Sequence, residues 1–205
     1  MSVNEEKEEL EILGTNLYDD GKYEEAIRCF DKAIKLEPND AGPWASKASA
    51  QNNIGKYDDA LNSVEEALRL NPNHMNALNN KAGILFTLGK NSEALSYFDK
   101  MIEIEPTFAN AYNGKATVLV MSIDEARSYE EATKNYDEAI KCVDTAIKLE
   151  PSDLGYQENK NKILSVIETF EHIKRGDLME SDLDDNFAGF SWEKAEDLVG
   201  KLFEK

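Results

Sequence analysis

The sequence is poor in the residues that form disulfide frameworks, membrane spans and nucleic-acid surfaces. It contains only two cysteines, Cys29 and Cys142, which are too few for a disulfide framework. No apolar run approaches the ~20 residues of a membrane span, and the acidic start lacks the layout of a signal peptide. Basic residues are also scarce, at 23 against 41 acidic ones, and the net charge is −18. Because an acidic surface repels phosphate groups, we expect no nucleic-acid and no membrane partner.

The remaining composition is that of a folded protein. The chain has 205 residues, of which 41% are hydrophobic. This content is sufficient for a core, and the length suits one domain or two small ones. Together with the scarcity of cysteine, it predicts a soluble protein of the cytoplasm.

Four of the five prolines recur in nearly identical settings. Pro38, Pro72 and Pro106 are 34 residues apart, and Pro151 follows after 45, which is one period plus 11 inserted residues. A fixed period of this length is typical of a repeat protein, in which each unit is one supersecondary element. Proline also ends a helix, so we expect each one to follow the second helix of a unit.

The block before each proline has the spacing of an amphipathic helix. Ala26, Phe30 and Ala33 follow one another at i, i+4 and i+7, and thus lie on one helical face. Small alanines let two helices approach closely, while the larger residue fills the space between them. The equivalents are Ala60, Val64 and Ala67, then Ala94, Phe98 and Met101, then Ala139, Val143 and Ala146.

This pattern resembles the tetratricopeptide repeat, in which a helix–turn–helix recurs every 34 residues. The first unit keeps the Leu13-Gly14 pair and then Ala26, Phe30 and Pro38, and the second keeps Trp44 and Ala48. The resemblance implies an all-α fold, a right-handed superhelix of helix pairs that binds a partner along its groove. The predicted repeats are residues 7–40, 41–74, 75–108 and 109–153, and a capping helix is predicted over 154–175.

The 11 inserted residues fall between the two helices of the fourth repeat. Ser128 followed by Glu131 is a capping-box pattern, which predicts that the second helix begins near Tyr129. The first helix is expected to continue to about Ser122, with a loop over residues 123–128. The insertion is either a tolerated loop or a contact for a partner, and the sequence leaves both open.

The resemblance also implies which side chains face the groove. None of those positions carries a basic residue, so the clamp with which co-chaperone members of this family hold a C-terminal carboxylate is not expected. Asparagine recurs instead, and an amide offers a donor and an acceptor to a peptide backbone. The alternative is that asparagine is only a soluble residue on exposed helices. The predicted peptide-binding residues are Tyr18, Asn52, Asn76, Asn79, Asn80, Phe86, Asn110, Asn113, Val120 and Met121.

No group of residues in the sequence predicts catalysis, a cofactor or a metal. His74 and His172 have no ligand partner at metal spacing, and no phosphate-binding loop is present. Cys29 and Cys142 lie at equivalent places on second helices of different repeats, where they are interpreted as small buried hydrophobes.

The last thirty residues have a different character. Residues 176–190 are an acidic linker, and residues 191–205 form an amphipathic pattern whose apolar face has to be buried. The tail helix either folds back on the repeats as a cap or inhibitor, docks on a second copy to give a homodimer, or opens a further domain. In the last case its sequence resembles the first helix of Mrr-like nucleases. The predicted docking face consists of Trp192, Leu198, Val199, Leu202 and Phe203.

These observations predict a non-catalytic scaffold or adaptor that holds an extended peptide or a helix of a partner protein. The alternative is a regulatory or accessory module of a larger enzyme or assembly, with the tail helix as inhibitor or dimerisation element.

Overall fold

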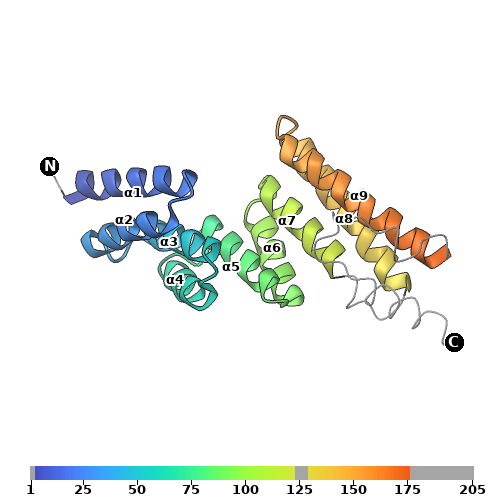
Figure 1. Cartoon of the computed structure of the whole chain (residues 1–205), viewed down its shortest axis with the longest axis horizontal. Coiled ribbons are helices and arrows are strands. Elements are labelled where there is room, and N and C mark those ends of the chain that lie inside the picture. Colours follow the sequence, from blue (N-terminus) through green and yellow to red (C-terminus); the bar gives the residue numbers. More distant parts are fainter. Residues whose placement is uncertain (1–2, 123–128, 176–205) are drawn as a thin grey trace. The chain divides into compact units, whose positions relative to one another are not determined.

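The computed structural model describes residues 3–122 and 129–175, and all regular secondary structure within these ranges is helical (Figure 1). The chain forms two compact units, Met1–Ile104 and Glu105–Lys205. The helices of unit 1 are α1 (Val3–Asp19), α2 (Tyr23–Leu36), α3 (Ala41–Asn53), α4 (Tyr57–Leu70), α5 (Met75–Thr87) and α6 (Asn91–Ile104). Those of unit 2 are α7 (Ala109–Met121), α8 (Tyr129–Leu149) and α9 (Leu154–Arg175). The predicted all-α fold of helix pairs is confirmed.

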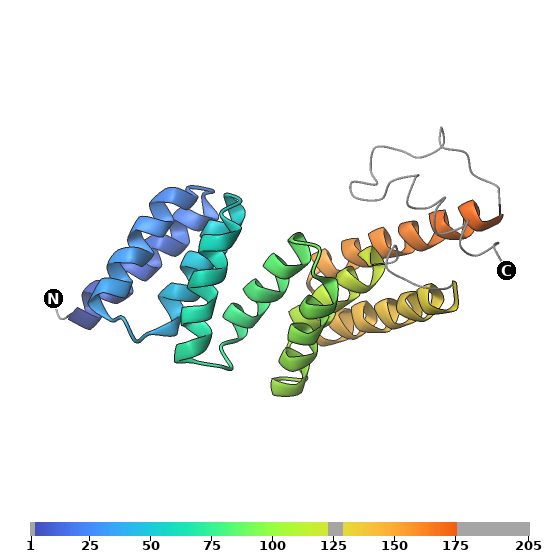
Figure 2. The same cartoon turned by 90° about the horizontal axis from the view of Figure 1, so that it is seen from below.

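Consecutive helices of unit 1 pack as neighbours, and each pair also contacts the next (Figure 2). The alanines that the sequence places on one face are fully buried in this packing. Ala26 and Phe30 of α2 form one buried cluster with Ala50 of α3, so the first pair joins the second through α2. Ala60 and Val64 of α4 join Ile84 of α5 in the same way, which links the second pair to the third.

Short turns join the two helices of each pair. Gly21, Gly55 and Gly89 all have φ between 72° and 75°, a region that other residues avoid because of their Cβ atoms. Between pairs, Asp40 caps α3 by accepting a hydrogen bond from Gly42 N at 2.9 Å, and His74 Nδ1 accepts one from Ala77 N at 3.3 Å. These caps satisfy amide groups that a helix start leaves without partners.

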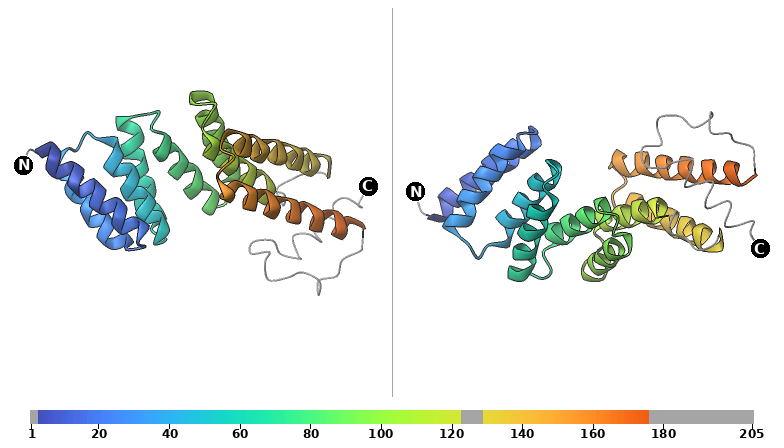
Figure 3. Two further views of the ribbon diagram at one scale, coloured as in Figure 1. Left: turned by 90° about the horizontal axis from the view of Figure 1, so that it is seen from above. Right: turned by 60° about the horizontal axis from the view of Figure 1, so that its bottom comes forward.

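In the described part of unit 2, α9 lies against both α7 and α8 (Figure 3). Ala109, Ala146 and Tyr156 form its described core cluster, with one residue from each helix. The second helix of the fourth repeat begins at Tyr129, and α9 spans Leu154–Arg175, the range predicted for the capping helix. The predicted loop 123–128, the linker 176–190 and the tail helix 191–205 lie outside the described residues.

Within these helices, Gly14 allows α1 to approach Phe30. A Cβ atom at Gly14 would come within 2.6 Å of Phe30 Cε1, and Phe30 is only 1% exposed. A ring with so little free space around it cannot move aside without disturbing the cluster that it shares with Ala26 and Ala50.

We therefore predict that Gly14→Ala destabilises unit 1 by about 1–3 kcal/mol through overpacking. Gly83 in α5 is the matched control, because a Cβ atom there meets nothing within 4 Å. Gly83→Ala should instead stabilise by about 0.5–1 kcal/mol, since alanine is the better helix former. Urea unfolding followed by circular dichroism measures both. Equal stability of the two variants would contradict the packing argument.

Candidate functional site

The surface formed by the first helices α1, α3 and α5 of unit 1, called here the first-helix face, contains a cavity of about 210 Å³. Its lining residues are Thr15, Tyr18, Asp19, Phe30, Ser46 and Ser49. Five of the six come from α1 and α3, and Phe30 reaches it from α2. Of these residues, the sequence prediction had placed only Tyr18 in its peptide-binding set.

Hydrogen bonds fix the side chains around this cavity. Thr15 Oγ1 donates to Glu11 O at 2.9 Å, and Ser49 Oγ donates to Ala45 O at 3.4 Å. Tyr18 Oη accepts from Asn53 Nδ2 at 2.9 Å, which connects α1 to α3. The Tyr18 ring also meets Tyr23 edge to face, with ring centroids 5.3 Å apart. The lining is therefore held in place before any ligand arrives.

The asparagines predicted on α3 and α5 differ in their surroundings. Asn80 Nδ2 donates to Ala45 O at 2.9 Å, so part of this amide links two repeats. Asn76 is exposed, and Asn79 and Phe86 are half-buried. Asn52 is half-buried, and its Oδ1 atom is enclosed without a hydrogen-bond partner. Asn76, Asn79 and Phe86 thus present free surface, while Asn80 already has a structural role.

The asparagines on α7 are engaged by the capping helix. Tyr156 Oη donates to Asn110 Oδ1 at 3.0 Å, and Asn159 Nδ2 donates to Asn113 Oδ1 at 2.7 Å and approaches Thr117 Oγ1 at 3.0 Å. Burial, followed by the charges of Glu150 and Asp153, raises the pKa of Tyr156, so it stays protonated as a donor. In unit 2 these amides therefore hold α9.

Val120 requires a correction. It was expected to offer apolar contact to a peptide, but only 2% of it is exposed. It belongs to the core, because α7 buries residues on more than one face: Ala116, Val118 and Leu119 are buried beside it. Met121, the last residue of α7, is 41% exposed and remains accessible. The predicted tail face of Trp192, Leu198, Val199, Leu202 and Phe203 lies outside the described residues.

Lysines of the first helices pair with second helices instead of facing the cavity. Lys47 of α3 contacts Asp31 of α2 at 2.7 Å, and Lys81 of α5 contacts Glu65 of α4 at 3.5 Å. The two lysines are 34 residues apart, and so are the two acids. In unit 2, Lys160 contacts Asp144 at 2.7 Å. Lys47 thus directs its charge toward α2, and no cation lines the cavity between α1 and α3.

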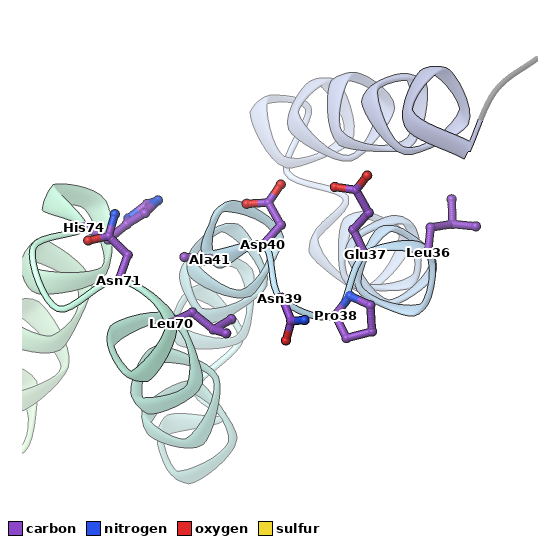
Figure 4. A pocket seen from close by; sticks show the side chains of 9 residues that line it. All are labelled: Leu36, Glu37, Pro38, Asn39, Asp40, Ala41, Leu70, Asn71 and His74. Atoms are coloured by element: carbon purple, nitrogen blue, oxygen red, sulfur yellow. The ribbon is translucent and has the colours of Figure 1, made fainter.

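A second, larger hollow of about 630 Å³ lies at the turns between repeats of unit 1. Figure 4 shows the carboxylates of Glu37 and Asp40 pointing toward α1 at its edge. There they meet Lys7 Nζ, at 3.3 Å from Glu37 and 2.5 Å from Asp40, and Glu11 lies 3.7 Å away. Lys7 is 8% exposed, so this is an ion-pair cluster that joins α1 to the turn before α3.

The cluster raises the pKa of some of its members and lowers that of another. The hydrogen bond to Asp40 outweighs burial and raises the pKa of Lys7 well above its usual value. Burial alone would raise the pKa of Asp40, but the hydrogen bonds from Lys7 and Gly42 outweigh it and hold that pKa below its usual value. Burial raises the pKa of Glu11. Because the acids of this hollow are already paired with Lys7, the cluster serves to fasten α1 rather than to bind a ligand.

The described residues offer little for other chemistry. Among them, no three histidine, cysteine or carboxylate side chains meet in a way that could hold a metal ion. Cys29 and Cys142 are buried and form no disulfide. Within the same ranges, no helix combines the length and the apolar character that crossing a membrane requires.

Four family models, each of a tetratricopeptide repeat, match residues 8–40, 29–62, 46–107 and 125–153. Together they cover more than half of the sequence, and the helix pairs of the structure have the same period. The chain belongs to the tetratricopeptide repeat family. No match was found among curated proteins.

Solved structures resemble the chain at low sequence identity. MamA residues 41 to the end from Desulfovibrio magneticus RS-1 is 19% identical, with a TM-score of 0.57 over 85% of this chain and 98% of that one. PilF of Pseudomonas aeruginosa is 16% identical, with a TM-score of 0.66 over 84% and 74%. The second tetratricopeptide domain of human RPAP3, solved with the HSP70 peptide SGPTIEEVD, is 25% identical, with a TM-score of 0.53 over 57% and 98%.

The Lys7 cluster yields a prediction with a matched control. Asp40 and Asp153 each accept a hydrogen bond from the glycine two residues on, at 2.9 and 2.8 Å, and Asn caps a helix as well as Asp does. Asp40→Asn should destabilise by about 1 kcal/mol at pH 7, a modest value because the carboxylate is one-third exposed and screened by water. Asp153→Asn should change stability by less than half as much, since no cation of the described residues forms an ion pair with its carboxylate.

The same pair of variants tests the pH dependence. A lowered carboxyl pKa contributes stability above its unfolded value of ~3.9 and loses it as the pH falls through the folded value. The difference between wild type and Asp40→Asn should therefore shrink in urea titrations as the pH falls below ~3.9, and should disappear at a pH low enough to protonate the carboxyl of Asp40 in the folded state. A difference that persists at this pH would show that the charge of Asp40 is not its source.

The amides that hold α9 yield a further prediction. Asn159→Ala should weaken the contact of α9 with α7 by about 1 kcal/mol, which raises hydrogen exchange in residues 154–168 by roughly fivefold. Asn161→Ala, at an exposed position of the same helix, is the control and should leave exchange unchanged. Equal exchange in the two variants would show that the bonds to Asn113 and Thr117 do not fasten this helix.

Proposed function

We propose that this protein is a non-catalytic interaction scaffold that binds an extended segment of a partner protein on the first-helix face of unit 1. The observation that carries the proposal is the preformed cavity between α1 and α3, with its lining of hydroxyl groups, one carboxylate and two aromatic rings. A lining already fixed by internal hydrogen bonds loses little conformational entropy when a ligand binds.

The comparison with human RPAP3 supports a peptide as the class of ligand. That protein has the same fold, and its structure contains a bound peptide. The bound peptide ends in Glu-Glu-Val-Asp, whereas no cation lines the cavity described here. We therefore propose a ligand that differs from acidic C-terminal tails, because uncompensated carboxylates would be repelled by Asp19 and by the chain's charge of −18.

Part of the predicted peptide-binding set carries over to this proposal. Asn76 and Asn79 supply amide groups to the peptide backbone, and Tyr18 and Phe86 supply aromatic surface. Asn80 contributes indirectly, because its hydrogen bond to Ala45 O fixes α5 against α3. Asn52 is likewise assigned no direct contact with the peptide, because its side-chain oxygen is enclosed. The amides of Asn110 and Asn113 are engaged by α9, so the proposal places the ligand on unit 1.

Two broader predictions rest on the sequence alone. The first is that the protein acts in the cytoplasm, which is inferred from its composition. The alternative role, as a regulatory or accessory module of a larger assembly, rests on the tail helix and its dimer or inhibitor hypotheses. Both depend on residues or surroundings outside the described ranges.

Selection of random linear peptides on the immobilised full chain tests the proposed function. Selected peptides should shift the amide resonances of α1, α3 and α5 in spectra of the 15N-labelled chain. The double variant Asn76→Ala, Asn79→Ala should weaken them by about five- to tenfold, because two hydrogen bonds to the peptide are lost.

The control is Asn62→Ala, which removes an exposed asparagine from the second helix α4 and should leave affinity unchanged. Alanine favours helix more than asparagine, so none of these variants should unfold. Peptides whose shifts lie away from the first-helix face, or equal affinity for the double variant and the control, would overturn the proposed function.

A further inference from the structure

The cavity between α1 and α3 presents more hydrogen-bond acceptors than donors. The hydroxyl protons of Thr15 and Ser49 are directed to carbonyl groups of their own helices, so both oxygens can only accept from a ligand. Asp19 accepts only, as an ionised carboxylate. Tyr18 Oη accepts from Asn53 and keeps its own proton to donate, and Ser46 adds a hydroxyl group that can donate or accept. A ligand that fits this lining must bring several donors.

The electrostatics of the cavity favour a cation. Asp19 is the last residue of α1, at the end where the helix dipole is negative, and the last turn of α1 contains no basic residue. A carboxylate at this end of a helix does not stabilise it, because its charge has the same sign as the dipole. Lys22 pairs with Asp20 at 3.0 Å, and Lys47 with Asp31 at 2.7 Å. None of the residues that line the cavity is positively charged.

Aromatic rings set the kind of cation. The aromatic surface open to a ligand is that of Tyr18, a half-buried ring held edge to face by Tyr23, since Phe30 also belongs to the lining but is only 1% exposed. A guanidinium group is planar, stacks on aromatic rings and carries five N–H donors directed outward. An ammonium group is a compact, strongly hydrated charge with three donors and is a poorer match to acceptors spread over two helices.

We propose that the cavity lined by Thr15, Tyr18, Asp19, Phe30, Ser46 and Ser49 binds the side chain of an arginine in the partner segment. This inference rests on the proposed function, which it narrows to arginine-bearing peptides. The guanidinium group donates to Asp19 and to the hydroxyl oxygens, while its plane lies against aromatic surface. The asparagines of α5 hold the backbone of the same segment further along the face.

Titration of the 15N-labelled full chain with four capped pentapeptides, acetyl-Ala-Ser-Xaa-Ser-Ala-amide, tests this inference. Xaa is arginine, lysine, glutamate or citrulline, the last being nearly isosteric with arginine but uncharged. The arginine peptide should shift the amides of the cavity residues and bind at least about fivefold more tightly than the citrulline peptide. Lysine should be intermediate, and glutamate should be the weakest.

Two acidic neighbours provide matched variants. Asp19→Asn should weaken the arginine peptide by about fivefold and leave the citrulline peptide unchanged, since only a charge-assisted hydrogen bond is lost. Asp20→Asn removes the same charge one residue away, outside the lining, and should change neither. Equal binding of arginine and citrulline, shifts away from the cavity, or equal effects of the two variants would overturn the inference.

The two proposals fail in different ways. Library-selected peptides that bind the first-helix face without an arginine preference would overturn the inference and leave the proposed function intact. Peptides that bind only elsewhere would overturn both. Absence of binding by the arginine pentapeptide up to millimolar concentration would also overturn the inference, whatever the library selects.

Discussion

Helices of this protein approach one another at alanines that have no exposed surface. Ala26, Ala60 and Ala94 lie in the first turn of the second helix of successive pairs in unit 1, and each is fully buried. A side chain of any larger size at these places would separate the helices, because the interior has no free volume to absorb it. Gly14 carries the same constraint further, since even a methyl group there would collide with Phe30. The spacing of α1 and α3, and therefore the cavity between them, follows from this packing.

Polar side chains also connect the helices that pack against one another at these alanines. Asn80 reaches from α5 to a carbonyl group of α3, and Asn159 reaches from α9 to Asn113 of α7. Each is the sixth residue of its helix, so the same place in the repeat makes an equivalent link in both units. Lys47, Lys81 and Lys160 form ion pairs with the preceding second helix. These links use amides and lysines for packing, and they leave a first-helix face without positive charge.

The resulting surface differs from one that holds acidic tails. Hydroxyl groups whose protons are directed into the helix backbone can only accept, and the carboxylate of Asp19 adds to the negative end of α1. Electrostatic complementarity of this kind sets which partner binds more than how tightly it binds. At long range, the net charge of −18 also favours basic partner segments, because it attracts them to the chain.

The sequence by itself determined the local structure of this protein. Its 34-residue period and its prolines predicted the helix pairs, and the capping-box pattern of Ser128 and Glu131 predicted the start of α8 at Tyr129, because these features depend on short stretches of the chain. Only the tertiary structure decided how the asparagines are used. Asn110 meets Tyr156 across 46 residues and Asn80 meets Ala45 across 35, and periodicity does not specify which partner a side chain reaches across such separations. Burial of Val120 and the cavity at Thr15, Ser46 and Ser49 were likewise decided by packing between helices, which a one-dimensional pattern of polar and apolar residues does not contain.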